Sequence, residues 1–572
     1  MQPDNRFLDD LSQTSVRVEP ALTLESPDAA SWDADCDVLV VGVGLAGVCA
    51  ALRAAEDSNL QVMAIDRGLG GGASQLSGGV IYMGGGTRAQ QEAGVEDTPE
   101  NMAEYLTYET GDIVRGDTVR RYAEASSGFQ DWLEKYGARF GGPMTEEKTS
   151  YPNDASLYYS GNELTVPGRE RAKPAARGHR AKPAAGGEPK KLSGEYLLPP
   201  LIASMEARPN VRFMRHTRAT RLITDADGAV IGIEVQTISQ GAAAWRHGMA
   251  MKLCNNIVAA SLGLTSKLYG AIVGIEAGAK PLRIRVRKGV VLSAGGFTHN
   301  RPMMAKTALP SYQNSHPLGT IADDGSGIKL GMSVGARTDL LDRISAWKFV
   351  YPAESWVRSC SVGPDGERLV GEEYYGARTG DAVFQKGGGK GWLIMDEPIQ
   401  QMVREEIASM KKMLFQKIQF RATQKDYTVS APTIEELAQR LGLPPEKVKA
   451  TVEAYNGHID RGEPDPLGKS EKYRRPIRTG PFYATDIGAA LKLSPIPALT
   501  MGGLVVDEDT GQVLSAEGGV VPGLYAAGRT AVGICSNYYV SGLSLGDCVW
   551  SGMRAAEAIK GNGGAAALVA GQ

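Results

Sequence analysis

The first clear hydrophobic pattern of the chain lies near its N-terminal end. Residues 36–43 form an apolar run rich in valine, and residues 48–56 follow with the alanine-rich composition of a helix. A second apolar run, residues 60–65, ends at Asp66. Short β-branched runs of this kind are typical of strands that are buried on both faces in a parallel sheet. The order of strand, helix and strand predicts an α/β unit.

Later parts of the chain predict elements of other kinds. Residues 211–235 alternate between apolar and polar positions and predict a hairpin, and residues 284–293 predict another buried strand. Between about residues 300 and 495 the composition changes, with more aromatic and charged residues. Within this region, residues 433–441 and 445–455 have the spacing of amphipathic helices. This change predicts a second domain that is inserted into the first.

Three segments stand apart by composition. Residues 167–191 are basic and rich in Ala, Pro and Gly, which is typical of a surface loop, and we assign them no chemistry. Residues 249–279 form an apolar stretch broken by polar residues; a packed helical insertion is favoured over a segment that presses on a membrane or a store of apolar substrate. Residues 1–35 lack the pattern of a secretory signal, so a cytoplasmic location is expected.

Composition excludes several classes of function. The 572 residues carry 62 Lys and Arg against 65 Asp and Glu, and a net charge of −3 argues against a nucleic-acid partner. No long stretch is free of polar residues, so no integral membrane span is predicted. The six Cys form no CxxC pair, and no metal site is predicted. Glycine is abundant, at 71 residues, which indicates backbone that closely approaches a ligand.

A glycine motif joins the first strand to its helix. In this GxGxxG pattern, Gly42 allows a tight turn, Gly44 lets the backbone touch a pyrophosphate, and Gly47 lets helix and strand pack closely. The N-terminus of the helix offers free N–H groups to the phosphates. Asp66 stands about where a carboxylate that binds the adenosine ribose is expected. Together these positions predict a dinucleotide cofactor.

A second glycine-rich segment distinguishes FAD from NAD. Residues 70–79 form a long loop of Gly and Ser where an NAD-binding domain would continue into a helix, and its amides and hydroxyls suit a bulky polar ring system. Residues 74–87 resemble the flavin loop of the fumarate reductase and 3-ketosteroid dehydrogenase flavoprotein superfamily. Residues 70–87 contain no His that would bind the flavin covalently, so the resemblance implies noncovalent FAD.

This resemblance extends from about Asp33 to Ile559 and implies an α/β fold. Residues 33–300 and 490–560 would form a Rossmann-like FAD-binding domain with a parallel sheet. Residues 301–489 would form an inserted α+β catalytic cap domain, and residues 1–32 and 561–572 would be tails. Residues 177–180 also resemble an ordered stretch of family members. The expected cofactor-binding residues are Gly42, Gly44, Leu45, Ala46, Gly47, Asp66, Arg67, Ser74, Ser77, Gly78, Gly79, Ala219, Ala294, Gly295, Gly296, Gly528, Arg529, Ser544 and Leu545.

Residues 536–547 indicate the reaction. Fumarate and succinate enzymes carry an Arg here to bind a carboxylate, whereas this segment contains neither Arg nor His. Its pattern Tyr-x-Ser-Gly-x-Ser-Leu closely resembles the 3-ketosteroid Δ4-dehydrogenase branch. The resemblance implies that Tyr539 accepts a proton, that Ser541 is its hydrogen-bond partner, and that flavin nitrogen 5 accepts the hydride. The Ser544-Leu545 turn would direct a helix N-terminus at the flavin.

Other assignments stay open. Tyr351, in a segment that resembles the family's second tyrosine segment, is a candidate proton relay or alternative base. Tyr538 and Gly542 have the spacing of the 3-ketosteroid Δ1-dehydrogenases, although the Pro and Gly residues of that loop are missing. We therefore expect a hydrophobic 3-ketosteroid substrate, a carbon 4 to carbon 5 double bond and a quinone-like electron acceptor. The alternatives are Δ1-dehydrogenation, an ene-reductase of the fumarate reductase type acting on a non-steroid substrate, and an electron-transfer subunit.

Overall fold

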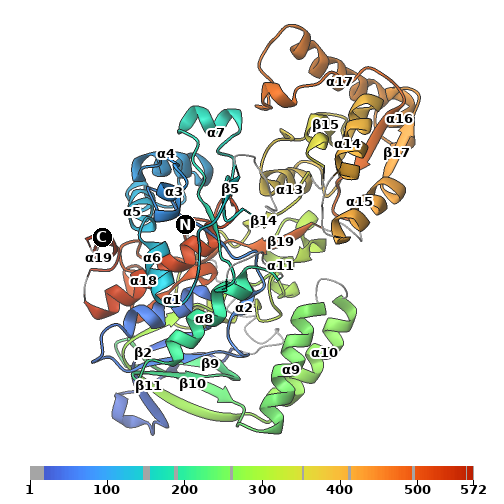
Figure 1. The fold of residues 1–572 in the computed structure, drawn as a ribbon. Coiled ribbons are helices and arrows are strands. Elements are labelled where there is room, and N and C mark those ends of the chain that lie inside the picture. Colours follow the sequence, from blue (N-terminus) through green and yellow to red (C-terminus); the bar gives the residue numbers. More distant parts are fainter. Residues whose placement is uncertain are drawn as a thin grey trace.

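The computed structural model describes residues 18–145, 155–185, 191–257, 262–350, 353–409, 414–491, 496–561 and 563–570. A large α/β part lies beside a smaller part that projects from it (Figure 1). The large part contains a nine-stranded sheet in the order β1-β9-β10-β11-β2-β3-β8, in which β22 pairs with β11 and β21 pairs with β22. Its strands are β1 (Leu22–Thr23), β2 (Ala34–Val41), β3 (Val62–Ile65), β8 (Val211–Met214), β9 (Thr217–Thr224), β10 (Val230–Thr237), β11 (Lys280–Leu292), β21 (Gln512–Leu514) and β22 (Val520–Ala526).

β2 is buried on both faces, as its apolar run predicts. Val38 and Val40 belong to one hydrophobic core, whereas Leu39 and Val41 belong to another on the opposite face of the sheet. β2 pairs in parallel with β3 and with β11, which confirms the predicted α/β unit. α1 (Leu45–Ala54) and α18 (Leu543–Lys560) pack together in the core of Val38. The last long helix of the chain therefore returns to the first unit.

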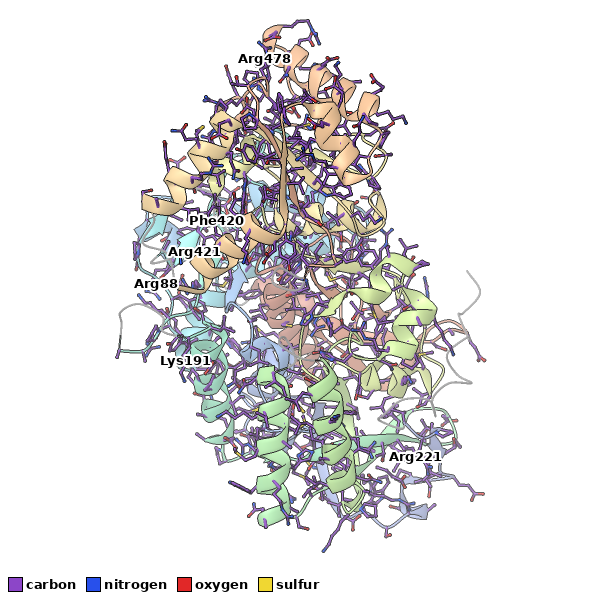
Figure 2. The ribbon with its side chains drawn as sticks, turned by 90° about the vertical axis from the view of Figure 1, so that its right-hand side faces the viewer. Arg88, Lys191, Arg221, Phe420, Arg421 and Arg478 are labelled. Atoms are coloured by element: carbon purple, nitrogen blue, oxygen red, sulfur yellow. The ribbon has the colours of Figure 1, made fainter. Side chains whose placement is uncertain are left out.

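A pair of helices is inserted between β10 and β11. The predicted hairpin is found as β9 and β10, and its first residues split off as β8, a parallel partner of β3. The inserted helices are α9 (Ala242–Ile257) and α10 (Leu262–Glu276), which contact each other along one edge of the molecule (Figures 1 and 2). The apolar stretch thus belongs to an inserted helix pair, as expected, although Met249 and Leu253 of α9 stay exposed.

The smaller part is built on an antiparallel sheet in the order β15-β16-β18-β17. Both predicted amphipathic helices are present, as α16 (Ile434–Leu441) and α17 (Pro445–Asp460). The other elements of this part are β15 (Cys360–Val362), β16 (Trp392–Asp396), β17 (Thr428–Ala431), β18 (Phe482–Asp486), α13 (Gly376–Gln385), α14 (Glu397–Ser409) and α15 (Leu414–Asp426).

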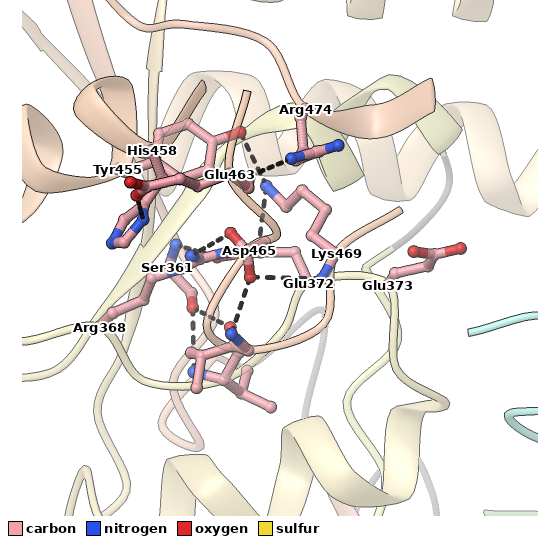
Figure 3. Close-up of polar contacts among 12 residues, drawn as sticks. Ser361, Arg368, Glu372, Glu373, Tyr455, His458, Glu463, Asp465, Lys469 and Arg474 are labelled. Atoms are coloured by element: carbon pink, nitrogen blue, oxygen red, sulfur yellow. Dashed lines mark hydrogen bonds and ion pairs between the residues drawn. The ribbon is translucent and has the colours of Figure 1, made fainter. Parts of the chain in front are cut away.

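A buried ionic cluster joins the loop after α17 to the segment after β15 (Figure 3). Lys469 pairs with Glu372 at 2.9 Å, and both side chains are fully buried. Arg368 bridges Glu372 at 2.7 Å and Asp465 at 2.5 Å. Burial would raise the pKa of Glu372, but the charges of Lys469 and Arg368 lower it to about 2. Each charge in the cluster has an opposite partner, so the cluster holds the cap together.

The two parts are interlocked through a three-stranded sheet, β12-β19-β14. β19 (Pro497–Thr500) comes from the return segment, whereas β12 (His316–Pro317) and β14 (Ile344–Ala346) come from the expected cap. The segments expected to be tails also contribute: β1 pairs with β9, and α19 (Ala565–Ala570) buries Leu568. Strand pairing therefore joins the expected cap to the FAD-binding part, and the segments expected to be tails are packed against the rest of the fold.

The basic segment is mostly not a surface loop. Its residues 178–180 form β7, a central strand of a sheet in which β7 lies between β4 (Val80–Tyr82) and β6 (Leu157–Tyr158), with β5 (Met144–Thr145) at the edge beside β6. Arg177 is fully buried and pairs with Asp97 at 2.7 Å, and His179 is buried beside it. The interpretation as a surface loop is wrong here, because the carboxylate of Asp97, distant in the sequence, neutralises the charge of Arg177 in the core. The expectation that residues 177–180 form an ordered stretch is confirmed. Residues 186–190 lie outside the described residues.

The remaining helices and strands complete the fold. They are α2 (Gly72–Gln75), α3 (Arg88–Glu92), α4 (Pro99–Thr110), α5 (Gly116–Ser126), α6 (Phe129–Lys135), α7 (Val166–Arg171), α8 (Gly194–Glu206), α11 (Arg301–Thr307), α12 (Ser326–Met332), β4 (Val80–Tyr82), β5 (Met144–Thr145), β6 (Leu157–Tyr158), β7 (Gly178–Arg180), β13 (Thr338–Asp339) and β20 (Gly503–Leu504). Within the described ranges, each helix is too short or too polar to cross a membrane.

Candidate active site

A cavity of about 340 Å³ lies at the carboxyl ends of β2 and β3. This is the edge at which open α/β sheets bind nucleotides. Twelve of the expected cofactor-binding residues line it: Gly42, Gly44, Leu45, Ala46, Asp66, Arg67, Ser74, Ala219, Ala294, Gly295, Gly528 and Arg529. Seven expected residues lie outside its lining: Gly47, Ser77, Gly78, Gly79, Gly296, Ser544 and Leu545.

The glycine turn between β2 and α1 forms the floor of the cavity. Gly42 has φ +95°, and a Cβ there would lie 2.7 Å from the Ser293 carbonyl oxygen. A Cβ at Gly47 would lie 2.0 Å from the Gly42 carbonyl oxygen, so this glycine allows helix and turn to touch. The Leu45 N–H at the start of α1 donates to Ser74 Oγ at 3.2 Å. The turn thus presents the start of α1 to the cavity.

Backbone amides orient the Asp66 carboxylate at the end of β3. Its Oδ2 accepts the Val43 N–H at 2.9 Å, and its Oδ1 accepts the Gly68 N–H at 2.7 Å and the Gly70 N–H at 3.3 Å. These contacts fix the carboxylate in the cavity wall. A carboxylate is acceptor-only when ionised, which suits the hydroxyl groups of a ribose.

Arg67 is turned toward the inserted helices. Its guanidinium pairs with Glu276 at 2.7 Å and with Asp324 at 3.1 Å, and it donates to the Tyr269 hydroxyl at 3.0 Å. His247 of α9 donates from Nε2 to the same Glu276 at 3.1 Å. Arg67 therefore anchors α9 and α10 beside the cavity, a role that its position after Asp66 does not reveal.

α9 supplies a wall of the cavity that was not expected from the sequence. Four of its residues line the cavity: Met251, Lys252, Asn255 and Asn256. The sequence signal was present, because two adjacent Asn interrupt an apolar helix. The sequence alone does not indicate what the two amides face.

The flavin-loop residues hold one another and the start of α8. Ser77 Oγ donates to the Ser74 carbonyl at 2.7 Å and accepts the Gly79 N–H at 3.1 Å. Gly79 has φ +62°, and a Cβ there would lie 2.2 Å from the Ser193 carbonyl carbon. Gly78 lies between them in the same turn. Ser77, Gly78 and Gly79 therefore hold the loop in shape without lining the cavity themselves.

The Arg529 side chain is another charged group in the lining of the cavity. It pairs with Asp323 at 2.5 Å, and Asp323 Oδ1 also accepts the Gly296 N–H at 3.3 Å. Gly296 allows this approach, since a Cβ there would lie 3.1 Å from Arg529 Nη1. That Nη1 is buried and has no hydrogen-bond partner among the described residues. A buried donor of this kind fits an electron-rich ligand group in the cavity.

Tyr539 is buried in front of the N-terminus of α18. Its hydroxyl lies 3.2 Å from Ser544 Oγ, and its ring stacks on Trp347 with centroids 4.8 Å apart and leans on Tyr375. Burial raises the pKa of Tyr539 to about 12, against the lowering effects of the Ser544 hydroxyl, the Gly542 amide and the charge of Arg529. The phenol is therefore protonated at neutral pH in this state.

The other expected catalytic residues occupy different surroundings. The Tyr538 ring lies under the Arg378 guanidinium at 4.7 Å, and Arg378 pairs with Glu109 at 2.9 Å. Ser541 is held through its backbone, whose carbonyl accepts the Ser160 hydroxyl at 2.9 Å.

Gly542 begins α18 with φ +91° and closes against β4. A Cβ there would lie 2.9 Å from the Tyr82 nitrogen, and its carbonyl accepts the Tyr82 N–H at 3.0 Å. Ser544 and Leu545 follow in the first turn of the helix. Tyr351 lies outside the described residues. Trp347, Tyr375 and Arg378 surround the two tyrosines, and none of the three was singled out from the sequence.

Comparison with known proteins places the chain in a family. A family model described as an FAD binding domain matches residues 37–545. The chain is 33% identical over 531 residues to the 3-oxo-5-alpha-steroid 4-dehydrogenase of Comamonas testosteroni, covering 89% of this chain and 96% of that protein. It is 27% identical to a 3-oxosteroid 1-dehydrogenase of Mycolicibacterium smegmatis, covering 88% of this chain and 93% of that protein.

A solved structure shares the whole architecture. The 3-ketosteroid-Δ4-(5α)-dehydrogenase of Rhodococcus jostii RHA1, in complex with 4-androstene-3,17-dione, is 29% identical and superposes with a TM-score of 0.78. The match covers 95% of this chain and 99% of that chain. The α/β fold with its cap and the expected superfamily resemblance are thereby confirmed. The chain belongs to the FAD-binding-domain family of flavin-dependent oxidoreductases and is a homologue of the 3-ketosteroid dehydrogenases.

Proposed function

We propose that the protein introduces a double bond between carbons 4 and 5 of a 3-ketosteroid, with noncovalently bound FAD as the hydride acceptor. The observation that supports this most is the placement of Tyr539, buried between Trp347 and the start of α18 and within reach of the charge of Arg529. The similarity to steroid 4-dehydrogenases over nearly the whole chain supports the same reaction.

The cavity has the groups that FAD requires. The amides at the start of α1 suit the pyrophosphate, Asp66 suits the ribose, and the unpartnered Nη1 of Arg529 suits an electron-rich atom of the flavin. The loop of residues 70–87 contains no His, which supports noncovalent binding. When bound, FAD supplies an acceptor for two electrons and a proton as hydride.

The second hydrogen leaves the substrate as a proton, which a side chain of the protein accepts. Tyr539 accepts the α-proton of the ketone, and the Ser544 hydroxyl and the Gly542 amide stabilise the phenolate that must exist before it does so. We propose that Ser541, two residues on, assists the same group, although the hydroxyl that Tyr539 contacts is that of Ser544. Trp347 and Tyr375 give the site apolar walls that suit a steroid.

Δ1-dehydrogenation has less support from the geometry. The ring of Tyr538, which would serve that reaction with Gly542, packs against Arg378, and Arg378 is itself paired with Glu109. The ring of Tyr539 instead stacks on Trp347 and leans on Tyr375, which are apolar walls that suit a steroid. The quinone-like acceptor and the cytoplasmic location stay predictions from the sequence.

The test is anaerobic absorbance of the purified holoprotein during addition of a saturated 3-ketosteroid in its 5α and 5β forms, with succinate as control. We expect one steroid epimer to bleach the flavin, and product analysis to show a carbon 4 to carbon 5 double bond. Bleaching by succinate alone, or a carbon 1 to carbon 2 product, would overturn the proposal.

A further inference from the structure

The outer face of α9 carries an apolar stripe. Trp245, Met249 and Leu253 stand four residues apart and therefore share one side of the helix. Their exposed fractions are 68%, 52% and 48%. The opposite side of α9 is buried against the protein at His247 and Cys254. In Figure 2 the inserted helices lie at the front of the molecule, with no other segment drawn over them. The stripe therefore faces outward.

The exposed charged side chains of α9 and α10 have one sign, since the acidic Glu276 at the end of α10 is buried. From residue 241 to residue 275 the sequence contains Arg246, Lys252 and Lys267 and neither Asp nor Glu. All three basic side chains are exposed, and within the described part of the chain none of them forms an ion pair. The inserted helices thus form a local positive surface on a chain whose net charge is −3.

We propose that this face of α9, formed by Trp245, Met249 and Leu253, binds the surface of an anionic lipid bilayer, assisted by the exposed basic side chains of Arg246 on α9 and Lys267 on α10. Trp is suited to the boundary between acyl chains and headgroups, because its ring is apolar and its N–H is polar. Met and Leu enter the apolar side of that boundary, while Arg and Lys attract anionic headgroups. The helix lies on the bilayer, since none of the described helices meets the requirements for a span.

A second copy of the chain is a poorer occupant. A two-fold contact would bring each patch against itself and place the basic side chains of one copy against those of the other. Three apolar side chains also fall well short of the roughly 800 Å² per partner that a stable dimer buries. A lipid surface supplies the opposite charge and needs no shape match.

This proposal goes beyond the proposed reaction and does not depend on it. A steroid substrate and a quinone-like acceptor would both dissolve in the bilayer that the α9 face binds. The binding test below uses neither, so its failure would leave the steroid assignment untouched.

The experiment is flotation of the FAD-containing protein with vesicles of phosphatidylcholine, alone or mixed with phosphatidylglycerol. We expect the protein to float with the mixed vesicles and the bound fraction to fall as NaCl is raised. Trp245→Ser combined with Met249→Ser and Leu253→Ser should lower the partition coefficient about tenfold or more. Arg246→Gln with Lys267→Gln should lower it only for the mixed vesicles.

Leu309→Ser is the matched control, since Leu309 is 50% exposed and lies outside α9 and α10. It should bind vesicles like the parent protein, and the FAD absorbance of every variant shows that it is folded. Equal flotation of the parent and the triple-serine variant would overturn the proposal, as would a parent protein that stays unbound at low salt. A parent that is dimeric in sedimentation, with a monomeric triple-serine variant, would assign the face to a second copy instead.

Discussion

The ion pair that anchors the inserted helices offers a quantitative test of the cavity wall. Glu276 of α10 accepts hydrogen bonds from His247 of α9 at 3.1 Å and from Arg67 at 2.7 Å. Glu276→Gln keeps the size of the side chain and removes its charge. Among the described residues, Arg67 then retains only Asp324 as a charged partner, and the link between the inserted helices and Arg67 is weakened.

The pKa of Glu276 gives the size of the effect. Burial would raise this pKa, but the hydrogen bond from His247 and the charge of Arg67 lower it from 4.5 to about 2. One pKa unit corresponds to about 1.4 kcal/mol, so the charge of Glu276 contributes about 3 kcal/mol to folding. Because the folded pKa is depressed, this contribution is complete above pH 4.5 and is lost as the pH falls toward 2.

The assay is urea unfolding of the holoprotein at pH 7, followed by the fluorescence of released FAD. We expect Glu276→Gln to lower the free energy of unfolding by about 2–3 kcal/mol and to weaken FAD binding, because α9 supplies part of the cavity wall. Glu206→Gln is the control, since its pair with Arg215 is about a third exposed and should contribute under about 1 kcal/mol. Equal losses in the two variants, or FAD binding unchanged in Glu276→Gln, would refute the role of this anchor.

Three further predictions concern single side chains. Tyr539→Phe should reduce turnover by about three orders of magnitude or more while FAD stays bound, as measured by steroid-dependent dye reduction and flavin absorbance, and activity within tenfold of the parent would refute its role as base. Asp66→Ala should lower the FAD content of the purified protein and leave the cap folded; full flavin occupancy would count against the ribose contact. Asp381, whose pKa burial raises to about 7, keeps its proton longer in the folded protein than in the unfolded chain, so stability should fall from about pH 4 to pH 7. Asp381→Asn should flatten that decline in urea midpoints, and an unchanged slope would contradict it.

The parts of the fold that follow local rules were predictable from the sequence. The strand, turn and helix from residue 36 to residue 56 are such a case, because Gly42 and Gly47 meet backbone contacts that admit no side chain. Asp66 also lies in the cavity wall, where a ribose contact was expected.

The parts that depend on distant partners were not predictable. Arg177 resembles a loop residue until Asp97, 80 residues earlier in the chain, neutralises its charge in the core. Arg67 lines the cavity, as expected, but its guanidinium pairs with Glu276 of α10, which the sequence around Arg67 does not indicate. Trp347 is an unremarkable aromatic in the sequence and gains its role only by stacking on Tyr539. In each case the local sequence contains the group and a contact across the fold determines its role.

The pKa of Tyr539 limits how the proposed reaction can work. A base acts only when deprotonated, so the rate should rise with pH until that pKa is reached. Burial places the pKa near 12, and ligand binding would remove more water, which raises it further. The Ser544 hydroxyl, the Gly542 amide and the charge of Arg529 lower the pKa of Tyr539. We therefore expect kcat/KM to increase with pH across the stable range, and Ser544→Ala to lower it at every pH by removing one of these donors. A rate that is independent of pH between 7 and 10 would show that Tyr539 is not the base.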